Sequence, residues 1–213
     1  MRDDRDRQRK TVSARIAPTI VVATTNRHKL LEIVRILDGL GCVIDPVAAH
    51  ADVPAPDETG RTFAENARLK ALCYGSLVPH LTVADDSGLE IDGLDGDPGV
   101  HSARFNGATY REKFDVIYTR LRARGALGSP ARFVCAVAAV EDGRIVFEAA
   151  GTVEGRIAEA PAGAGGFGYD PIFFYPPYGC TLAEVSADRK AAVSHRGHAF
   201  RKLRAFLAAR AGS

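Results

Sequence analysis

The sequence predicts an α/β protein with a mixed sheet. The segment TIVVAT (19–24) is a continuous apolar, β-branched run, typical of a strand buried on both faces, and a helical pattern follows it. Two later β-rich segments, 131–140 and 144–157, are separated by the tripeptide EDG (141–143), whose Asp-Gly pair is typical of a tight hairpin. An early strand–helix unit and a central antiparallel hairpin, with helices packed around them, indicate a mixed sheet.

Several elements precede the hairpin. The first helix is predicted by apolar residues at i, i+3, i+4 and i+7, namely Leu30, Ile33, Val34 and Leu37. Residues 42–47 could form a second strand. A polar loop then leads to Thr62 and Glu65, the S/T-x-x-E capping box of a helix whose expected buried stripe is Leu69, Leu72 and Cys73. The run LTVADD (81–86) predicts the next strand, which should stop at its two carboxylates and the turn-forming Ser-Gly pair after them.

The remaining elements lie on either side of the hairpin. A glycine-rich irregular stretch (93–107) comes before an amphipathic helix at 110–125, whose predicted apolar face is Phe114, Ile117, Tyr118 and Leu121. Beyond the hairpin, three segments complete the chain. They are a glycine-rich loop, an aromatic-rich run and a final helix, at 161–171, 172–179 and roughly 194–210.

The composition fits one globular domain. The 213 residues are 46% hydrophobic and 25% charged, which is a normal globular profile. No stretch approaches the ~18 consecutive apolar residues of a membrane helix, so no membrane partner is expected. The N-terminal residues lack the apolar core of a secretory signal, and their three aspartates argue against an organellar transit peptide.

The positive charge of the chain is concentrated at its N-terminus. Residues 1–17 hold six Lys/Arg and three Asp, a surplus of +3. Because the net charge of the whole chain is +2, the remaining 196 residues carry about −1. We therefore expect a disordered basic tail at 1–17 and a single domain at 18–213. A nucleic-acid binder would carry basic residues on its folded body, so no nucleic-acid partner is expected.

Four cysteines are spread far apart with no C-x-x-C spacing: Cys42, Cys73, Cys135 and Cys180. They suit neither a zinc site nor a disulfide framework. We expect them to be small packing residues of a protein that lives in a reducing, cytoplasmic compartment.

Cationic residues begin two of the predicted helices. Lys29 lies in the first turn after TTN (24–26), where the helix N-terminus already carries positive charge. Either an anion collects the helix N–H groups, the asparagine amide and the Lys29 ammonium, or Lys29 extends into water at a small cost. Near the last helix, Lys190, His195 and Arg196 form a second donor-rich patch, for which surface solvation is the ordinary alternative. Two such helix starts together favour an anion site between them.

Residues 163–168 match G-x-G-x-x-G, but the match does not indicate dinucleotide binding. That fingerprint needs a helix directly after it, and Pro171 with the β-favouring run that follows forbids one. What remains is a backbone that can approach a ligand closely, with Phe167 and Asp170 beside it. Phe167 is either a platform for stacking a base or a hydrophobic plug under the loop.

Carboxylates supply the remaining chemistry. Mg²⁺ prefers one or two protein carboxylates together with water and phosphate oxygens, and hard oxygen ligands are offered by Asp57, Glu58, Glu65, Asp85 and Asp86. By itself, DDSG is also typical of an ordinary strand-to-turn exit. Ser-His-Asp nucleophilic catalysis fits poorly because no G-x-S-x-G elbow occurs. Cationic groups for phosphates and carboxylates for a metal predict a nucleotide polyphosphate site.

Six blocks of the sequence make a known family recognisable: TTNRHKLLEI, ETGRTFAENARLKA, ADDSGLEIDGLDGDPGVHSARF, ARFVCAVAAV, GFGYDPIFF and KAAVSHRGHAFRKL. In this order and spacing they resemble the inosine triphosphate pyrophosphatase family of the RdgB type, from about residue 19 to 207. The resemblance implies a long mixed central sheet flanked by helices, in two lobes with the substrate cleft between them.

The resemblance also implies an activity. The family's enzymes are cytoplasmic, homodimeric and Mg²⁺-dependent, and they hydrolyse ITP, dITP and XTP to the monophosphate and pyrophosphate. Such a nucleoside triphosphate pyrophosphohydrolase would clear non-canonical purines from the nucleotide pool. The alternative is a purine nucleotide-sensing module that binds without turnover, which the joint presence of Asp86, Ser87 and Lys29 disfavours.

Site roles follow from the resemblance residue by residue. Asp86 matches the catalytic carboxylate and metal ligand, and Ser87 matches a substrate contact. Glu58 is expected as the second metal ligand, with Asp57 and Glu65 as alternatives, because the family often has Glu-Glu where this chain has Asp-Glu. Thr25 also departs from the usual Gly or His. The other substrate-binding positions are Thr24 to Lys29 (Thr24, Thr25, Asn26, Arg27, His28, Lys29) and Phe167, Gly168, Tyr169, Asp170, Lys190, His195 and Arg196.

Overall fold

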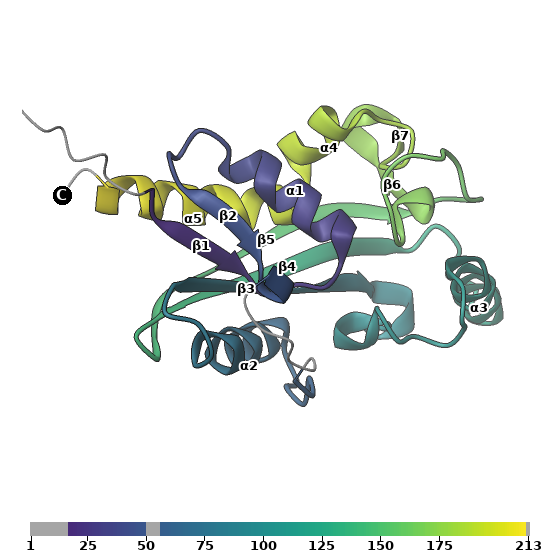
Figure 1. Cartoon of the computed structure of the whole chain (residues 1–213). Helices are drawn as coiled ribbons and strands as arrows, with labels where there is room; N and C mark the ends of the chain where they lie inside the picture. The colour runs from purple at the N-terminus through teal and green to yellow at the C-terminus, as the bar shows by residue number, and fades with distance from the viewer. Residues whose placement is uncertain (1–16, 50–55, 212–213) are drawn as a thin grey trace, which may run out of the picture.

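The computed structural model describes residues 17–49 and 56–211, and one sheet runs through them. Its strands are β1 (Thr19–Val22), β2 (Val43–Pro46), β3 (Leu81–Ile91), β4 (Pro130–Glu141), β5 (Arg144–Ile157), β6 (Phe173–Tyr175) and β7 (Cys180–Thr181). They lie in the order β2-β1-β3-β4-β5-β6-β7 (Figure 1). β1 is parallel to both neighbours, whereas the later pairings are antiparallel. The predicted mixed sheet and second strand are confirmed. The predicted tail lies, apart from residue 17, outside the described residues.

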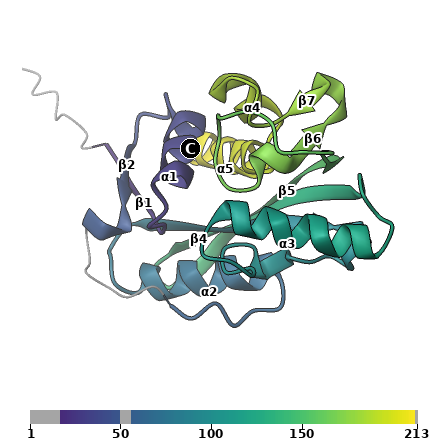
Figure 2. The ribbon, with the colours of Figure 1, turned by 90° about the vertical axis from the view of Figure 1, so that its right-hand side faces the viewer.

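The described residues also form five α-helices: α1 (Arg27–Leu37), α2 (Phe63–Gly75), α3 (Tyr110–Ala123), α4 (Ala187–Val193) and α5 (His195–Ala211). α1 and α5 lie on one face of the sheet and α2 on the other, while α3 closes one end (Figures 1 and 2). The predicted apolar face of α3 packs with β6 in a further buried cluster. None of these helices has the length and apolarity needed to cross a bilayer.

The central hairpin is confirmed with the turn that the sequence predicts. Glu141 pairs with Arg144, which leaves Asp142 and Gly143 as the two turn residues. Both have positive φ, at 50° and 72°. Asp and Gly tolerate this conformation better than other residues, and it matches the right-handed twist of the long strands β4 and β5.

The second predicted helix is confirmed at its start and wrong in its buried face. Thr62 and Glu65 form the reciprocal capping box of α2. The expected stripe does not face the core, because Leu72 is 40% exposed while Leu69 and Cys73 are only half-buried. The buried face instead includes two polar residues, which an apolar pattern cannot identify. Its members are Phe63, Asn66, Ala67, Lys70, Ala71 and Tyr74.

The other predicted helices are confirmed, with one departure in the buried face of α1 and one additional short helix. In α1, Ile33 and Leu37 are buried, but Val34 is 40% exposed because the stripe that packs on the sheet is narrower than predicted. The last helix begins at His195 as expected, and the short helix α4 before it was not predicted. The predicted face of α3 is confirmed, with Phe114, Ile117, Tyr118 and Leu121 all buried.

Strand β3 positions the site, and it does not end where the sequence predicts. It continues through DDSG to Ile91 because β4 pairs with it over residues 82–91. On its other edge, β1 pairs only as far as Val83. Over the described ranges, the next pairing on that edge is a single bridge from Glu90 to Pro98. Residues 84–88 therefore have a free edge, where side chains from both faces of the strand can reach one opening.

Candidate active site

A cavity of about 310 Å³ opens beside the free edge of β3, between the start of α1, the inner face of α2, the glycine-rich loop and the start of α5. Of the predicted site residues, Arg27 and His28 do not line it. The others do: Thr24, Thr25, Asn26, Lys29, Glu58, Asp86, Ser87, Phe167, Gly168, Tyr169, Asp170, Lys190, His195 and Arg196. The fold thus gathers five segments that are separate in the sequence at one place.

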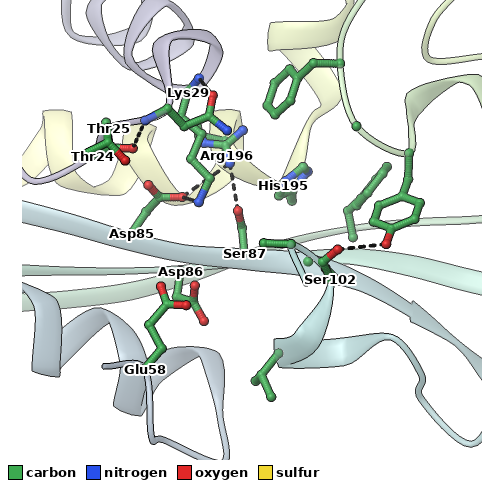
Figure 3. Close-up of a pocket in the computed structure, with 18 of the residues that line it drawn as sticks. Thr24, Thr25, Lys29, Glu58, Asp85, Asp86, Ser87, Ser102, His195 and Arg196 are labelled. Atoms are coloured by element: carbon green, nitrogen blue, oxygen red, sulfur yellow. Dashed lines mark hydrogen bonds and ion pairs between the residues drawn. The ribbon is translucent and has the colours of Figure 1, made fainter. Parts of the chain in front are cut away.

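Asp85 and Asp86 project from opposite faces of β3, as strand alternation requires (Figure 3). On the side of α1 and α5, Asp85 accepts hydrogen bonds from Lys29 Nζ at 3.0 Å and from Arg196 Nη2 at 3.3 Å. Arg196 also donates to the Ser87 hydroxyl at 2.8 Å. Burial opposes the ionised form of Asp85, but the charges of Lys29 and Arg196 outweigh it, so the pKa of Asp85 lies well below its ordinary value.

On the α2 side, Asp86 faces Glu58 and two buried residues of the helix. Lys70 Nζ lies 3.0 Å from Asp86 Oδ1 and 2.7 Å from Glu58 Oε1, and Asn66 donates to Asp86 Oδ2 at 3.2 Å. The two carboxylates therefore converge on one cation. Burial raises the pKa of Asp86 above its ordinary value, although Lys70 acts against it. A raised proton affinity suits a general base.

At the start of α1, the Lys29 ammonium has an ion-pair partner at the cavity wall. The Asn26 side chain caps the helix by accepting from the backbone N–H groups of His28 and Lys29, at 3.0 and 3.2 Å. The Lys29 ammonium does not extend into bulk water, since its side chain is 17% exposed and pairs with Asp85. It is held at the cavity wall.

The glycine-rich loop is followed not by an α-helix but by a single 3-10 turn, Asp170–Ile172, that leads into β6. Asp170 accepts from the backbone N–H of Phe167 at 2.7 Å and from the Lys190 ammonium. A Cβ at Gly166, whose φ is +65°, would lie 2.1 Å from the Asp170 carboxylate, so the loop requires glycine there. The half-buried Phe167 ring stacks on His28 with centroids 5.3 Å apart, and Lys190 Nζ lies 4.5 Å from its centroid. The ring lines the cavity and is not fully buried, and its role as a platform for stacking a base stays a prediction.

His195 forms part of the cavity wall as a neutral side chain. Its ring stacks on Phe133 with centroids 4.8 Å apart, and it is 5% exposed. Burial and the charges of Arg196 and Lys190 lower the pKa of His195 well below its ordinary value of 6.5. Its Nδ1 atom is buried without a hydrogen-bond partner in the described part of the chain. An uncharged imidazole with one free nitrogen can bind a polar group of a ligand.

We expect His195 to make stability fall with pH below about 6.5. The unfolded chain takes up a proton there that the folded protein does not, so the free energy of unfolding decreases by up to about 1.4 kcal/mol per pH unit. Urea unfolding at several values between about pH 7.5 and 5.5 measures the slope. His195→Gln should flatten it, and His101→Gln, at an exposed position, should not. An unchanged slope in His195→Gln would contradict the buried neutral state.

The carboxylates differ in their suitability as metal ligands. Glu65 is engaged in the capping box, where it accepts from the backbone N–H groups of Arg61 and Thr62. Asp57 is exposed and does not line the cavity. Only Glu58 lies beside Asp86. No group of three or more His, Cys, Asp or Glu side chains within 17–49 and 56–211 is arranged to hold a metal ion.

Sequence reasoning missed several residues that complete the site. Lys70 lies on the inner face of α2 at helical spacing from Ala67 and Tyr74, and this spacing was its only signal. Glu32, on α1, binds both Lys190 and Arg196 from behind the cavity. Other lining residues that were not predicted are Ala23, Tyr74, Gly88, Val100, Ser102, Ala103, Tyr110 and Phe133.

The fold and the cavity define an α/β protein whose cleft combines converging carboxylates, fixed cations and an aromatic platform, which is the chemistry that a phosphorylated nucleotide requires. The chain belongs to the Ham1 family, whose model matches residues 20–206. The family resemblance drawn from the six sequence blocks is confirmed.

Curated relatives match this chain over nearly their whole length. A protein of Gloeobacter violaceus named dITP/XTP pyrophosphatase is 46% identical over 184 residues, which are 86% of this chain and 91% of its own. A protein of Exiguobacterium sp. strain AT1b with the same name is 43% identical over 186 residues, 87% of this chain and 95% of its own.

Solved structures share the fold. A HAM1 protein from Coxiella burnetii superposes with a TM-score of 0.82 at 38% identity, over 89% of this chain and 98% of its own. The Staphylococcus aureus Ham1 protein has a TM-score of 0.80 at 33% identity, over 90% of this chain and 99% of its own. The predicted fold class is confirmed by these similarities.

Proposed function

We propose that this chain is a nucleoside triphosphate pyrophosphohydrolase that converts ITP, dITP and XTP to the monophosphate and pyrophosphate. Relatives 46% and 43% identical to it are named dITP/XTP pyrophosphatase. The observation that carries the proposal is the meeting of Asp85 and Asp86, from opposite faces of β3, at one cavity. The Asp85 side holds cations for a triphosphate, and the Asp86 side holds carboxylates for a metal and a water.

The two sides would divide the reaction between them. Lys29 and Lys190 would bind phosphate oxygens, and Arg196 would donate to the C6 oxygen of the base. Since carboxylates already fix these cations, little ordering is needed when substrate arrives. Phe167 would stack on the base. Asp86 would accept the proton of a water that attacks the α-phosphorus, with pyrophosphate as leaving group. Preorganised charge around the phosphates would supply most of the acceleration.

The donor set on the α2 side fits Mg²⁺. Asp86 and Glu58 aim oxygens at a common point, as their shared contact with Lys70 indicates. Two protein carboxylates, with water and substrate oxygens as the other ligands, are what Mg²⁺ ordinarily takes. Asp86 and Glu58 would hold the ion, which would neutralise charge on the triphosphate. Lys70 contacts both carboxylates, so its ammonium would have to move aside for the ion.

A coupled pyrophosphate assay tests the function. We expect pyrophosphate from ITP and XTP with Mg²⁺, far less from ATP, and none when EDTA removes the metal. The alternative, a sensing module, would bind ITP in calorimetry without releasing pyrophosphate. Release of inorganic phosphate in place of pyrophosphate would contradict attack at the α-phosphorus.

The setting of the enzyme is part of the proposal. The family resemblance supports a homodimer, which light scattering would measure directly. All four cysteines are free thiols, which supports a cytoplasmic location. Cations of α5 donate to backbone carbonyls, Arg201 to Ala191 and Ala192 and Lys202 to Ala150, which supports the absence of a nucleic-acid partner.

We propose that residues 18–213 form a single pyrophosphatase domain whose activity does not need residues 1–17. The family match begins at residue 20, and residues 1–17 hold the +3 charge surplus without apolar periodicity. Deletion of residues 1–17 should therefore leave ITP turnover and the melting temperature nearly unchanged. Turnover assays and thermal unfolding of the two proteins give the comparison, and a loss of more than a few degrees would show that the tail stabilises the domain.

A further inference from the structure

Ion pairs connect the two ends of the cavity without a break. Three cations and three carboxylates alternate from the start of α1 to the glycine-rich loop, in the order Lys29–Asp85–Arg196–Glu32–Lys190–Asp170. At the loop end, Asp170 fixes the backbone of Phe167. Beside β3, Arg196 donates to Ser87. The groups beside the base platform and the groups beside β3 are thus parts of one charged network.

Glu32 occupies the middle of this network and does not line the cavity. Its two oxygens are divided between two cations: Oε1 lies 2.8 Å from Lys190 Nζ, and Oε2 accepts from Arg196 Nη1 at 2.6 Å. Within the described residues, Glu32 is the one ion-pair link between these cations. Burial opposes its ionised form, but Arg196 and Lys190 outweigh it, so the pKa of Glu32 lies below its ordinary value.

The two cations need a shared anion to keep their places. Lys190 and Arg196 are 4% and 1% exposed, so water screens little of their mutual repulsion. Without Glu32, Lys190 would retain Asp170, and Arg196 would retain Asp85 and Ser87, but no ion pair among the described residues would join the two cations. A displacement of about 1 Å in a catalytic site can cost about 10²-fold in rate.

We propose that Glu32 is a positioning residue that couples selection of the base to engagement of the triphosphate, by fixing Lys190 and Arg196 relative to each other. The inference rests on the proposed function, because it assumes a base beside Phe167 and phosphates beside Lys29. Loss of Glu32 should therefore lower both the rate and the selectivity, although Glu32 touches neither end of the substrate.

Steady-state kinetics with ITP and ATP test the proposal. Glu32→Gln keeps the shape but offers one acceptor oxygen and an amide N–H₂ that opposes a cation. We expect kcat/KM for ITP to fall by about 30-fold or more, mostly in kcat, and the ITP/ATP ratio to fall by about 5-fold or more. Glu32→Asp retains the charge and should keep more of the ratio, and it serves if Glu32→Gln fails to fold. Glu148→Gln, which breaks an exposed pair with Arg68, should change neither value.

A cycle of variants tests the link without substrate. Lys29→Met and Asp170→Asn alter the two ends of the network, and their effects on the unfolding equilibrium constant in urea should deviate from multiplicativity by about 3-fold or more. In the Glu32→Gln or Glu32→Asp background, whichever folds, the deviation should shrink, most completely with glutamine. An unchanged deviation, or an ITP/ATP ratio that Glu32→Gln and Glu32→Asp both preserve, would overturn the proposal. A wild-type protein without ITP turnover would overturn the proposed function alone.

Discussion

Asp86→Asn is expected to lower ITP turnover by about 10²–10⁴-fold, the contribution of a general base. The substitution removes the charge and the basicity of Asp86 in a nearly isosteric exchange. It also turns an amide N–H₂ toward Lys70 or Asn66, both of which are donors to the carboxylate in the wild type. We therefore expect a loss of stability of about 1–3 kcal/mol as well, with the fold retained.

The matched control for this variant is Asp95→Asn. Asp95 is exposed, pairs with Arg124 and has a positive φ that asparagine also tolerates. It should leave turnover unchanged. Kinetics under saturating ITP and Mg²⁺, with circular dichroism to verify folding, provide the measurement. If Asp86→Asn stays within tenfold of wild type, the catalytic role passes to Asp85, because Glu65 is engaged in the capping box.

Arg196→Ala is expected to be the most destabilising single change at the site. The guanidinium is 1% exposed, and its removal leaves Glu32 and Asp85 each with one cation fewer. Removing one partner of a buried ion pair costs about 3–5 kcal/mol. We also expect the ITP/ATP turnover ratio to fall. Hypoxanthine presents an acceptor at C6 where adenine presents a donor, and arginine offers donors only.

Two further variants make this prediction specific. Arg120→Ala removes an exposed arginine that pairs with Asp97, and it should cost at most about 1 kcal/mol. Arg196→Lys retains the charge but not the forked donors, so it should be better folded than Arg196→Ala and still less selective than wild type. Urea unfolding and paired ITP and ATP assays give both quantities. Equal loss on ITP and ATP would assign Arg196 to phosphate binding or to structure and would refute its role in base selection.

The sequence correctly predicted those elements whose neighbouring residues favour the same local structure that the whole fold requires. The Asp142-Gly143 turn, the capping box at Thr62 and the apolar face of α3 each follow from a few neighbouring residues. The family blocks then assigned most of the cavity lining, since those residues lie in the quoted motifs. Arg27, at an exposed position outside the cavity, shows the limit of assigning a whole block.

The failures occurred where function overrides the ordinary pattern. α2 buries Asn66 and Lys70, which donate to Asp86, so a search for apolar spacing chose the wrong face. β3 buries two adjacent carboxylates because one edge of the strand is free, and that depends on where β1 ends. Glu32 lies within the first family block, but no neighbouring residue indicates its role, since its partners are more than 150 residues away along the chain.

The alternation of side chains along β3 also limits where the gene can tolerate the insertion or deletion of a single codon. Loss of one codon just before Asp85 would bring Asp86 to the Lys29 side and Ser87 opposite Lys70, and gain of one codon would place Asp85 opposite Lys70. Either change would place the wrong side chains on each side of the cavity even if the sheet re-formed. The turn at Asp142 and Gly143 faces no such constraint, because it lies at the tip of the hairpin. A library of single-codon insertions selected for activity should therefore retain members at that turn and lose those within residues 84–88.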